Sequence, residues 1–128
     1  MIGGRWPIAS CVAVVMACSR EPAPSVRLPE PLPPTPVTLL AGDSLYVMHC
    51  QSCHGRHALG TDLGPPLVHS VYAPRHHADA AFVLAVRNGV RAHHWTFGDM
   101  QPVPLVTSAQ VESLTAYVRW LQMQAGIH

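Results

Sequence analysis

Residues 50–54 are Cys-Gln-Ser-Cys-His, followed by Gly55, and no other stretch of the chain carries so specific a pattern. With two residues between them, Cys50 and Cys53 can bond to the two vinyl groups of a haem while the imidazole of His54 reaches the iron from one face. A redox-active dithiol or half of a zinc site would use the same two thiols. The histidine directly after the second cysteine favours covalent haem c.

The remaining cysteines do not suggest a different metal site. Cys11 and Cys18 lie near the N-terminus, and the sequence has no second Cys-x-x-Cys pair. One chain therefore cannot build a four-cysteine zinc or iron–sulfur site, and the spacing does not suggest a disulfide framework.

The composition is that of a small folded domain with little net charge. Of the 128 residues, 48% are hydrophobic and 12% are charged, which argues against an intrinsically disordered chain. Every basic residue is Arg, and the formal net charge at pH 7 is +1. Because the sequence has no basic stripe, we expect no nucleic acid partner and no strong electrostatic steering.

The N-terminal segment predicts export. Arg5 precedes an apolar run of about 11 residues, from Ile8 to Cys18, which is too short to span about 30 Å of hydrocarbon as a helix. A secretory signal has this arrangement, and we assign it to residues 1–17. An N-terminal core helix fits less well, because a Pro-rich stretch follows at once.

The end of this segment, Val15-Met16-Ala17-Cys18, resembles the lipobox of bacterial lipoproteins. The resemblance implies cleavage before Cys18 and a lipid on its sulfur, which would anchor the protein at the periplasmic or cell-surface side of a membrane. The alternatives are an ordinary signal peptide cleaved near this point, or an uncleaved leader, with a soluble or differently anchored product. Residues 19–40 contain seven Pro, so residues 18–40 are expected to be the anchor and an extended linker, with a disordered tail as the alternative.

Two helices can be predicted within residues 41–128. Asp79 can cap the first, and Gly89 can close it in a left-handed turn. Thr107 and Gln110 form a capping box at the start of the second. The apolar residues expected to face the core are Phe82, Val83 and Val86 in the first helix and Val111, Leu114, Val118 and Leu121 in the second.

Between the two ends of this domain lies a long irregular segment. Gly and Pro interrupt residues 55–78, and no periodic apolar run appears there. A loop of this length is uncommon inside a compact domain. A haem in the middle of the domain would supply the missing core.

Residues 41–128 as a whole resemble class I cytochrome c. The matching stretches are Ala41–Cys50 leading into the haem motif, Gly64–Leu67, Arg87–Val90 and Thr115–Arg119. The resemblance implies a small all-α cytochrome c fold, with about three to four helices wrapped around one covalent haem. It also implies that the first and last helices cross closely, with Gly42 and Tyr46 against Leu114 and Tyr117.

The same resemblance suggests which residues surround the haem. The carbonyl of Pro65 or Pro66 would accept a hydrogen bond from His54 and so fix the tautomer of its ring. Trp95 and Arg91 lie in a stretch that we interpret as a loop at the haem edge. Either of them would donate a hydrogen bond to a haem propionate.

A methionine normally binds the iron on the other face in this family. Met1 and Met16 lie in the predicted leader, and Met123 lies late in the last helix. Met48 is too close in the chain to the proximal histidine to reach the opposite face. Met100 is therefore the expected sixth ligand, although the family's Pro follows it one position later than usual. Its thioether would favour Fe(II) and raise the potential.

The sequence contains nine histidines, and those other than His54 offer competing ligands. His93 or His94 could replace the methionine in a bis-histidine site. The pairs His76–His77 and His93–His94 could instead bind a separate copper or zinc ion.

These features predict an electron carrier with no catalytic residue. Two protein ligands leave the iron no open position, so we expect redox proteins as donor and acceptor and no small-molecule substrate. A peroxidase-like haem enzyme or a gas or redox sensor is the alternative, and it would need a labile sixth ligand.

Overall fold

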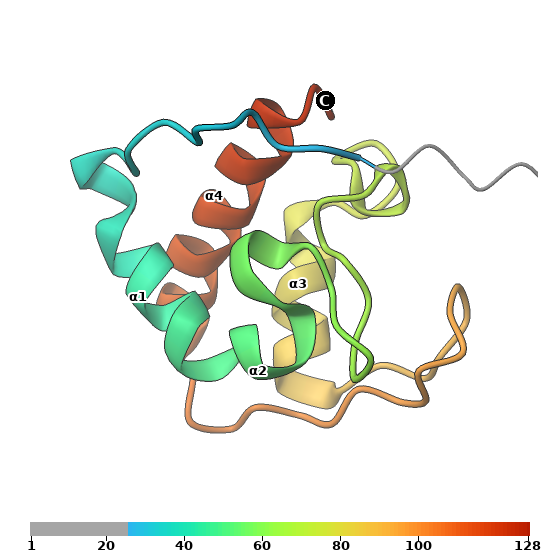
Figure 1. Cartoon of the computed structure of the whole chain (residues 1–128). Coiled ribbons are helices and arrows are strands. Elements are labelled where there is room, and N and C mark those ends of the chain that lie inside the picture. The colour runs from blue at the N-terminus through green and yellow to red at the C-terminus, as the bar shows by residue number, and fades with distance from the viewer. Residues whose placement is uncertain (1–25) are drawn as a thin grey trace, which may run out of the picture.

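The computed structural model describes residues 26–128, which form a helical unit (Figure 1). Its helices are α1 (Leu40–His49), α2 (Gln51–His54), α3 (Asp79–Asn88) and α4 (Ser108–Gln124), with short 3-10 turns η1 (Val37–Leu39), η2 (Arg56–Ala58) and η3 (Ser70–Tyr72). No β-strand forms within residues 26–128, and one isolated bridge joins Val90 to Met100. The predicted all-α class is confirmed. The predicted leader and Cys18 lie outside the described residues.

Helices α1 and α4 cross at close range. A β-carbon added at Gly42 would collide with the backbone of Ser113 and press on the side chain of Tyr117. The rings of Tyr46 and Tyr117 lie 5.7 Å apart between centroids. Leu114, also in α4, is buried and lines a cavity that is described below. The crossing thus depends on a residue without a side chain at position 42.

The predicted start and buried face of α4 are both confirmed. The Thr107 hydroxyl accepts from the N–H of Gln110 at 3.3 Å, and the Gln110 side chain accepts from the N–H of Thr107 at 2.8 Å. The core residues Val111, Leu114, Val118 and Leu121 are between 0% and 2% exposed. In α3, Phe82 and Val86 are buried and Val83 is half-buried.

Helix α3 begins at Asp79, but Asp79 does not cap it, so that prediction is wrong. The N-cap is Ala78, and no side chain makes a capping hydrogen bond. Asp79 Oδ1 instead accepts a hydrogen bond of 2.7 Å from Nε of Arg119 in α4. The carboxylate that the local pattern predicted as the cap is therefore paired with Arg119, a charged residue distant in the chain. Gly89 ends the helix with φ of 73°, as expected.

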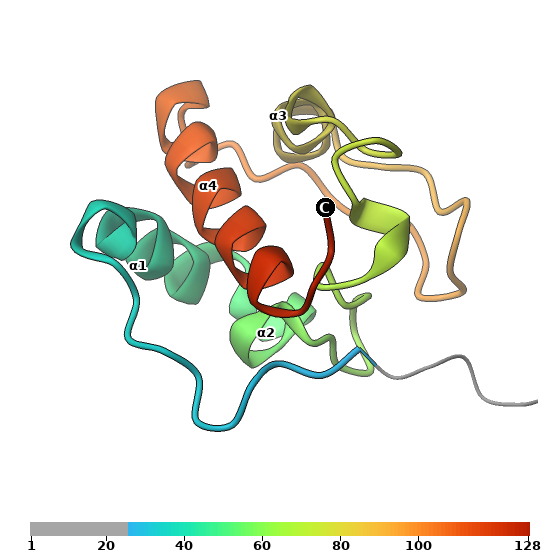
Figure 2. The same ribbon diagram turned by 90° about the horizontal axis from the view of Figure 1, so that it is seen from above.

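The described part of the Pro-rich segment is extended as far as Pro36 and helical from Val37, and it lies on the domain. Val26, Leu28 and Leu32 are half-buried and pack against the hydrophobic core. The Thr35 hydroxyl donates to the carboxylate of Asp43 in α1 at 3.3 Å. Figure 2 shows this stretch as an extended trace along the outside of the helices. Part of the predicted linker therefore belongs to the folded unit.

Candidate functional site

A cavity of about 340 Å³ lies at the centre of the fold. Most of its lining is aliphatic or aromatic, with contributions from the loop after α2, from α3 and from α4. Five residues predicted for the site line it together: Cys50, His54, Pro65, Trp95 and Met100. Because protein interiors are otherwise close-packed, an apolar cavity of this size indicates a site for a bound group.

The two cysteines of the motif lie at the junction of α1 and α2. Cys50 is half-buried, Cys53 is exposed, and both are free thiols. The N–H groups of Cys53 and His54 donate to the Cys50 carbonyl at 3.1 and 2.9 Å, so the motif forms one tight turn. Burial, followed by the nearby Cys53 thiol, raises the pKa of Cys50 to about 11. Redox dithiols depend on a lowered thiol pKa, so this environment argues against the dithiol alternative.

His54 is held in the form that binds a metal. Its Nδ1 lies 2.9 Å from the carbonyl oxygen of Pro65. Because a carbonyl only accepts, Nδ1 carries the proton, and Nε2 keeps a free lone pair. Burial lowers the pKa of His54, and the hydrogen bond to Pro65 partly opposes that change. The ring is therefore a neutral, oriented ligand at neutral pH.

The turn after α2 sets the position of Pro65. The Thr61 hydroxyl donates to the carbonyl of Cys53 at 2.5 Å, and the N–H of Thr61 donates to the carbonyl of Gly64 at 3.0 Å. Pro66 packs against Gly60 instead. Of the two prolines that the sequence offers, the structure brings Pro65 to His54.

Met100 reaches the cavity from the segment between α3 and α4. It is half-buried, and two backbone hydrogen bonds of 3.0 and 2.9 Å join it to Val90. A β-carbon at Gly89 would lie 2.5 Å from the Met100 carbonyl oxygen, so the two backbones pass at close range. Met48 and Met123 are 74% and 52% exposed and do not line the cavity. Among the described residues, Met100 is thus the methionine placed to act there.

The contacts of Trp95 and Arg91 with a haem propionate stay predictions, and the structure gives only the places of the two side chains. Trp95 lines the cavity, but its Nε1 donates to the hydroxyl of Tyr72 at 3.1 Å. Arg91 is exposed and does not line the cavity. The indole N–H is therefore already used to join two loops.

Two residues of α4 that the sequence pattern did not reveal hold the loop between α2 and α3 against this helix. Gln122 is fully buried, and its Nε2 donates to the carbonyls of Leu67 and Tyr72 at 2.8 and 3.1 Å. Arg119 donates from Nη1 to the same Tyr72 carbonyl at 2.5 Å and to Oε1 of Gln122 at 2.8 Å. The one available signal was a polar residue directly after Leu121 on an apolar helix, which is weak evidence by itself.

The set of donors fits a covalently bound haem: two free thiols, an oriented neutral imidazole and a thioether around one apolar cavity. A family model described as cytochrome c matches residues 39–122, which is more than half of the chain. No match to the chain was found among curated proteins or among solved structures. The matched stretch contains every residue placed at the cavity above.

Proposed function

The chain belongs to the cytochrome c family, and we propose that it is a single-haem electron carrier that works outside the cytoplasm. Members of this family bind haem c covalently and are generally electron carriers. The observation that carries the proposal is the meeting of Cys50, His54 and Met100 at one apolar cavity. The chain has a single Cys-x-x-Cys-His motif, which supports one haem per chain.

Each of these residues has a defined part in holding the group. Cys50 and Cys53 would form the two thioether bonds, His54 would bind iron through Nε2, and Met100 would bind through its sulfur. When bound, the haem supplies the one-electron redox couple. The protein contributes an apolar cavity and a neutral proximal ligand fixed by Pro65, both of which tune the potential.

Electron transfer fits this arrangement better than catalysis does. With His54 and Met100 both bound, the iron would have no position for a substrate. A peroxidase-like enzyme or a gas sensor would first have to release the methionine. Redox proteins are therefore the proposed donor and acceptor, docking near the edge of the cavity.

The holoprotein, produced with the machinery for haem attachment, tests this proposal. We expect one haem per chain that resists extraction into acidified organic solvent. The oxidised protein should also show the weak far-red absorption band of methionine bound to Fe(III). Haem that extracts freely would contradict covalent attachment, and a missing band would favour an enzyme or a sensor.

Anchoring through Cys18 is a separate proposal, supported by the lipobox resemblance and the Pro-rich stretch after it. No helix described between residues 26 and 128 is long and apolar enough to cross a membrane. Cys18→Ser should release the domain from the membrane fraction, because the acyl chains would have no attachment point. Mass spectrometry of the mature N-terminus is the direct measurement. An unmodified terminus at any other residue would rule the proposal out.

A further inference from the structure

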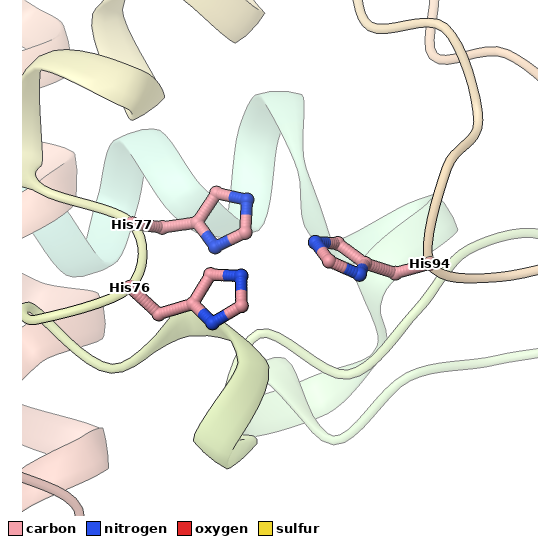
Figure 3. A group of neighbouring side chains, drawn as sticks. All are labelled: His76, His77 and His94. Carbon is pink, nitrogen blue, oxygen red and sulfur yellow. The ribbon is translucent and has the colours of Figure 1, made fainter.

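Imidazoles from two separate loops converge beside the cavity. His76 and His77 end the loop between α2 and α3, and His94 lies in the segment after α3. One ring nitrogen from each of the three lies within 4.8 Å of the other two. Figure 3 shows His94 approaching from the opposite side to the rings of His76 and His77, which stack 4.8 Å apart between centroids.

Two rings of this region already have a defined tautomer. Nδ1 of His77 lies 2.7 Å from the carbonyl oxygen of Val71, and Nδ1 of His93 lies 2.8 Å from that of Arg91. Both carbonyls only accept, so Nδ1 carries the hydrogen and Nε2 is left with a free lone pair. Metal-bound histidines usually donate their second ring nitrogen to such a carbonyl. His77 thus has Nε2 available as a ligand atom, and its ring is held by the hydrogen bond to Val71.

The two loops are also fixed relative to each other. Nη2 of Arg119 donates to the carbonyl of His77 at 2.5 Å, which ties its backbone to α4. Trp95, next to His94 in the chain, donates to the hydroxyl of Tyr72 at 3.1 Å. The backbone of His77 and the side chain next to His94 are thus each hydrogen-bonded in place, which reduces the ordering needed when an ion binds.

We propose that His76, His77 and His94 bind one first-row transition metal ion, Zn²⁺ or Cu²⁺, at the rim of the cavity. The group contains imidazoles and no carboxylate, a donor set that suits zinc and copper and not calcium or magnesium. The fourth position is taken by water or by His93, whose ring centroid lies 4.3 Å from that of His94.

The position of this site links it to the proposed haem without depending on it. His77 and His94 line the cavity, whereas His76 is exposed and does not. A bound ion would therefore sit beside the haem and add positive charge near it. The inference rests on the imidazoles, and it stands whether or not the haem carries electrons.

Zinc titration of the full-length holoprotein by isothermal calorimetry tests the site. We expect saturable binding of one Zn²⁺ per chain. His76→Ala and His94→Ala should each weaken the affinity by about tenfold or more, because each removes one imidazole ligand. His49→Ala and His128→Ala are matched controls outside the cluster and should leave the affinity unchanged.

Copper supplies a second, spectroscopic measurement. The electron paramagnetic resonance spectrum of bound Cu²⁺ should show coupling to imidazole nitrogens that His76→Ala and His94→Ala reduce and the control variants do not. Equal binding by all four variants, or no saturable binding, would overturn the proposal. Bis-histidine haem absorption caused by His94 would also overturn it. The haem content is measured separately, so a failure of haem attachment is distinguished from a failure of this site.

Discussion

The two sides of the cavity are held by very different amounts of structure. The His54 side, residues 50–67, follows α1 directly. Internal hydrogen bonds join His54 to Pro65 and Thr61 to Cys53, and the buried Gln122 of α4 donates to the carbonyl of Leu67. The Met100 side, residues 89–107, is mostly exposed. Besides the bridge between Val90 and Met100, it is held by the N–H of Val103, which donates to the carbonyl of Val86 in α3 at 2.8 Å, and by the bond from Trp95 to Tyr72. One ligand is therefore specified locally and redundantly, whereas the other depends on a few contacts.

The largest expected effect lies on the His54 side. His54→Ala should abolish the normal haem spectrum, because it removes the imidazole that directly follows Cys53 and is oriented by the carbonyl of Pro65. Cys50→Ala and Cys53→Ala should weaken attachment, since each removes one thioether bond. Covalent haem content and the absorption spectrum measure both effects. A normal haem spectrum from His54→Ala would contradict the assignment of His54 as the firmly positioned iron ligand.

Replacing the methionine should change the redox properties and keep the haem. Met100→His exchanges a soft ligand for a harder one that favours Fe(III), so the potential should fall strongly while the iron stays six-coordinate. Met100→Ala should also lower the potential and open a position for cyanide, carbon monoxide or peroxide. Voltammetry and ligand titration are the measurements.

Met123→Leu is the control for those substitutions, because Met123 is 52% exposed and lies away from the cavity. The redox potential of the Met123→Leu variant should stay close to that of the unmodified protein. If Met100→Ala keeps the native spectrum and potential, the assignment of Met100 is wrong, and His93 and His94 become the ligands to replace.

A backbone change should perturb the Met100 side alone. Gly89 has φ of 73°, and a β-carbon there would lie 2.5 Å from the Met100 carbonyl oxygen. Gly89→Ala should therefore weaken the methionine–iron bond and cost about 1–3 kcal/mol of stability, with covalent haem retained. Thermal loss of the far-red band is the measurement.

Gly98→Ala is matched to that change, since Gly98 also has positive φ, at 91°, but nothing lies within 4 Å of its added β-carbon. Gly98→Ala should introduce backbone strain but no steric clash. Its far-red band should therefore persist to a higher temperature than that of Gly89→Ala. Equal effects of the two substitutions would mean that the contact with Met100 is not what matters.

The smallest effect is expected where the Met100 side joins α4. Thr107→Ala removes the hydroxyl that accepts from the N–H of Gln110, and it should lower the free energy of unfolding by about 1 kcal/mol. Urea denaturation of the holoprotein measures this loss. Ser108→Ala, at the first position of the helix, should cost less. A larger loss from Ser108→Ala would contradict the capping role of Thr107.

The features that could be predicted from the sequence are those set by neighbouring residues. The Thr107 capping box, the buried stripe of α4 and the turn at Gly89 depend on spacing within one helix, and each forms as predicted. The haem motif is local in the same sense.

What could not be predicted depends on residues far apart in the chain. Asp79 looked like a helix cap, but it pairs with Arg119 from another helix. The hydrogen bond from the indole of Trp95 to the hydroxyl of Tyr72 likewise joins two different loops. In each case the partner lies far away in the chain, so only the tertiary arrangement identifies it.

The buried amide of Gln122 also has a consequence for how the molecule opens. It binds two carbonyls of the loop between α2 and α3, so that loop cannot leave the domain while α4 keeps its place. Amide protons on this side, such as that of Val68, which donates to Ala58, should exchange with solvent only through global unfolding. No buried side chain of α4 among the described residues donates to the backbone at Val90 or Met100 in this way. The amide protons of these two residues should therefore exchange through a small local fluctuation, long before the rest of the protein unfolds.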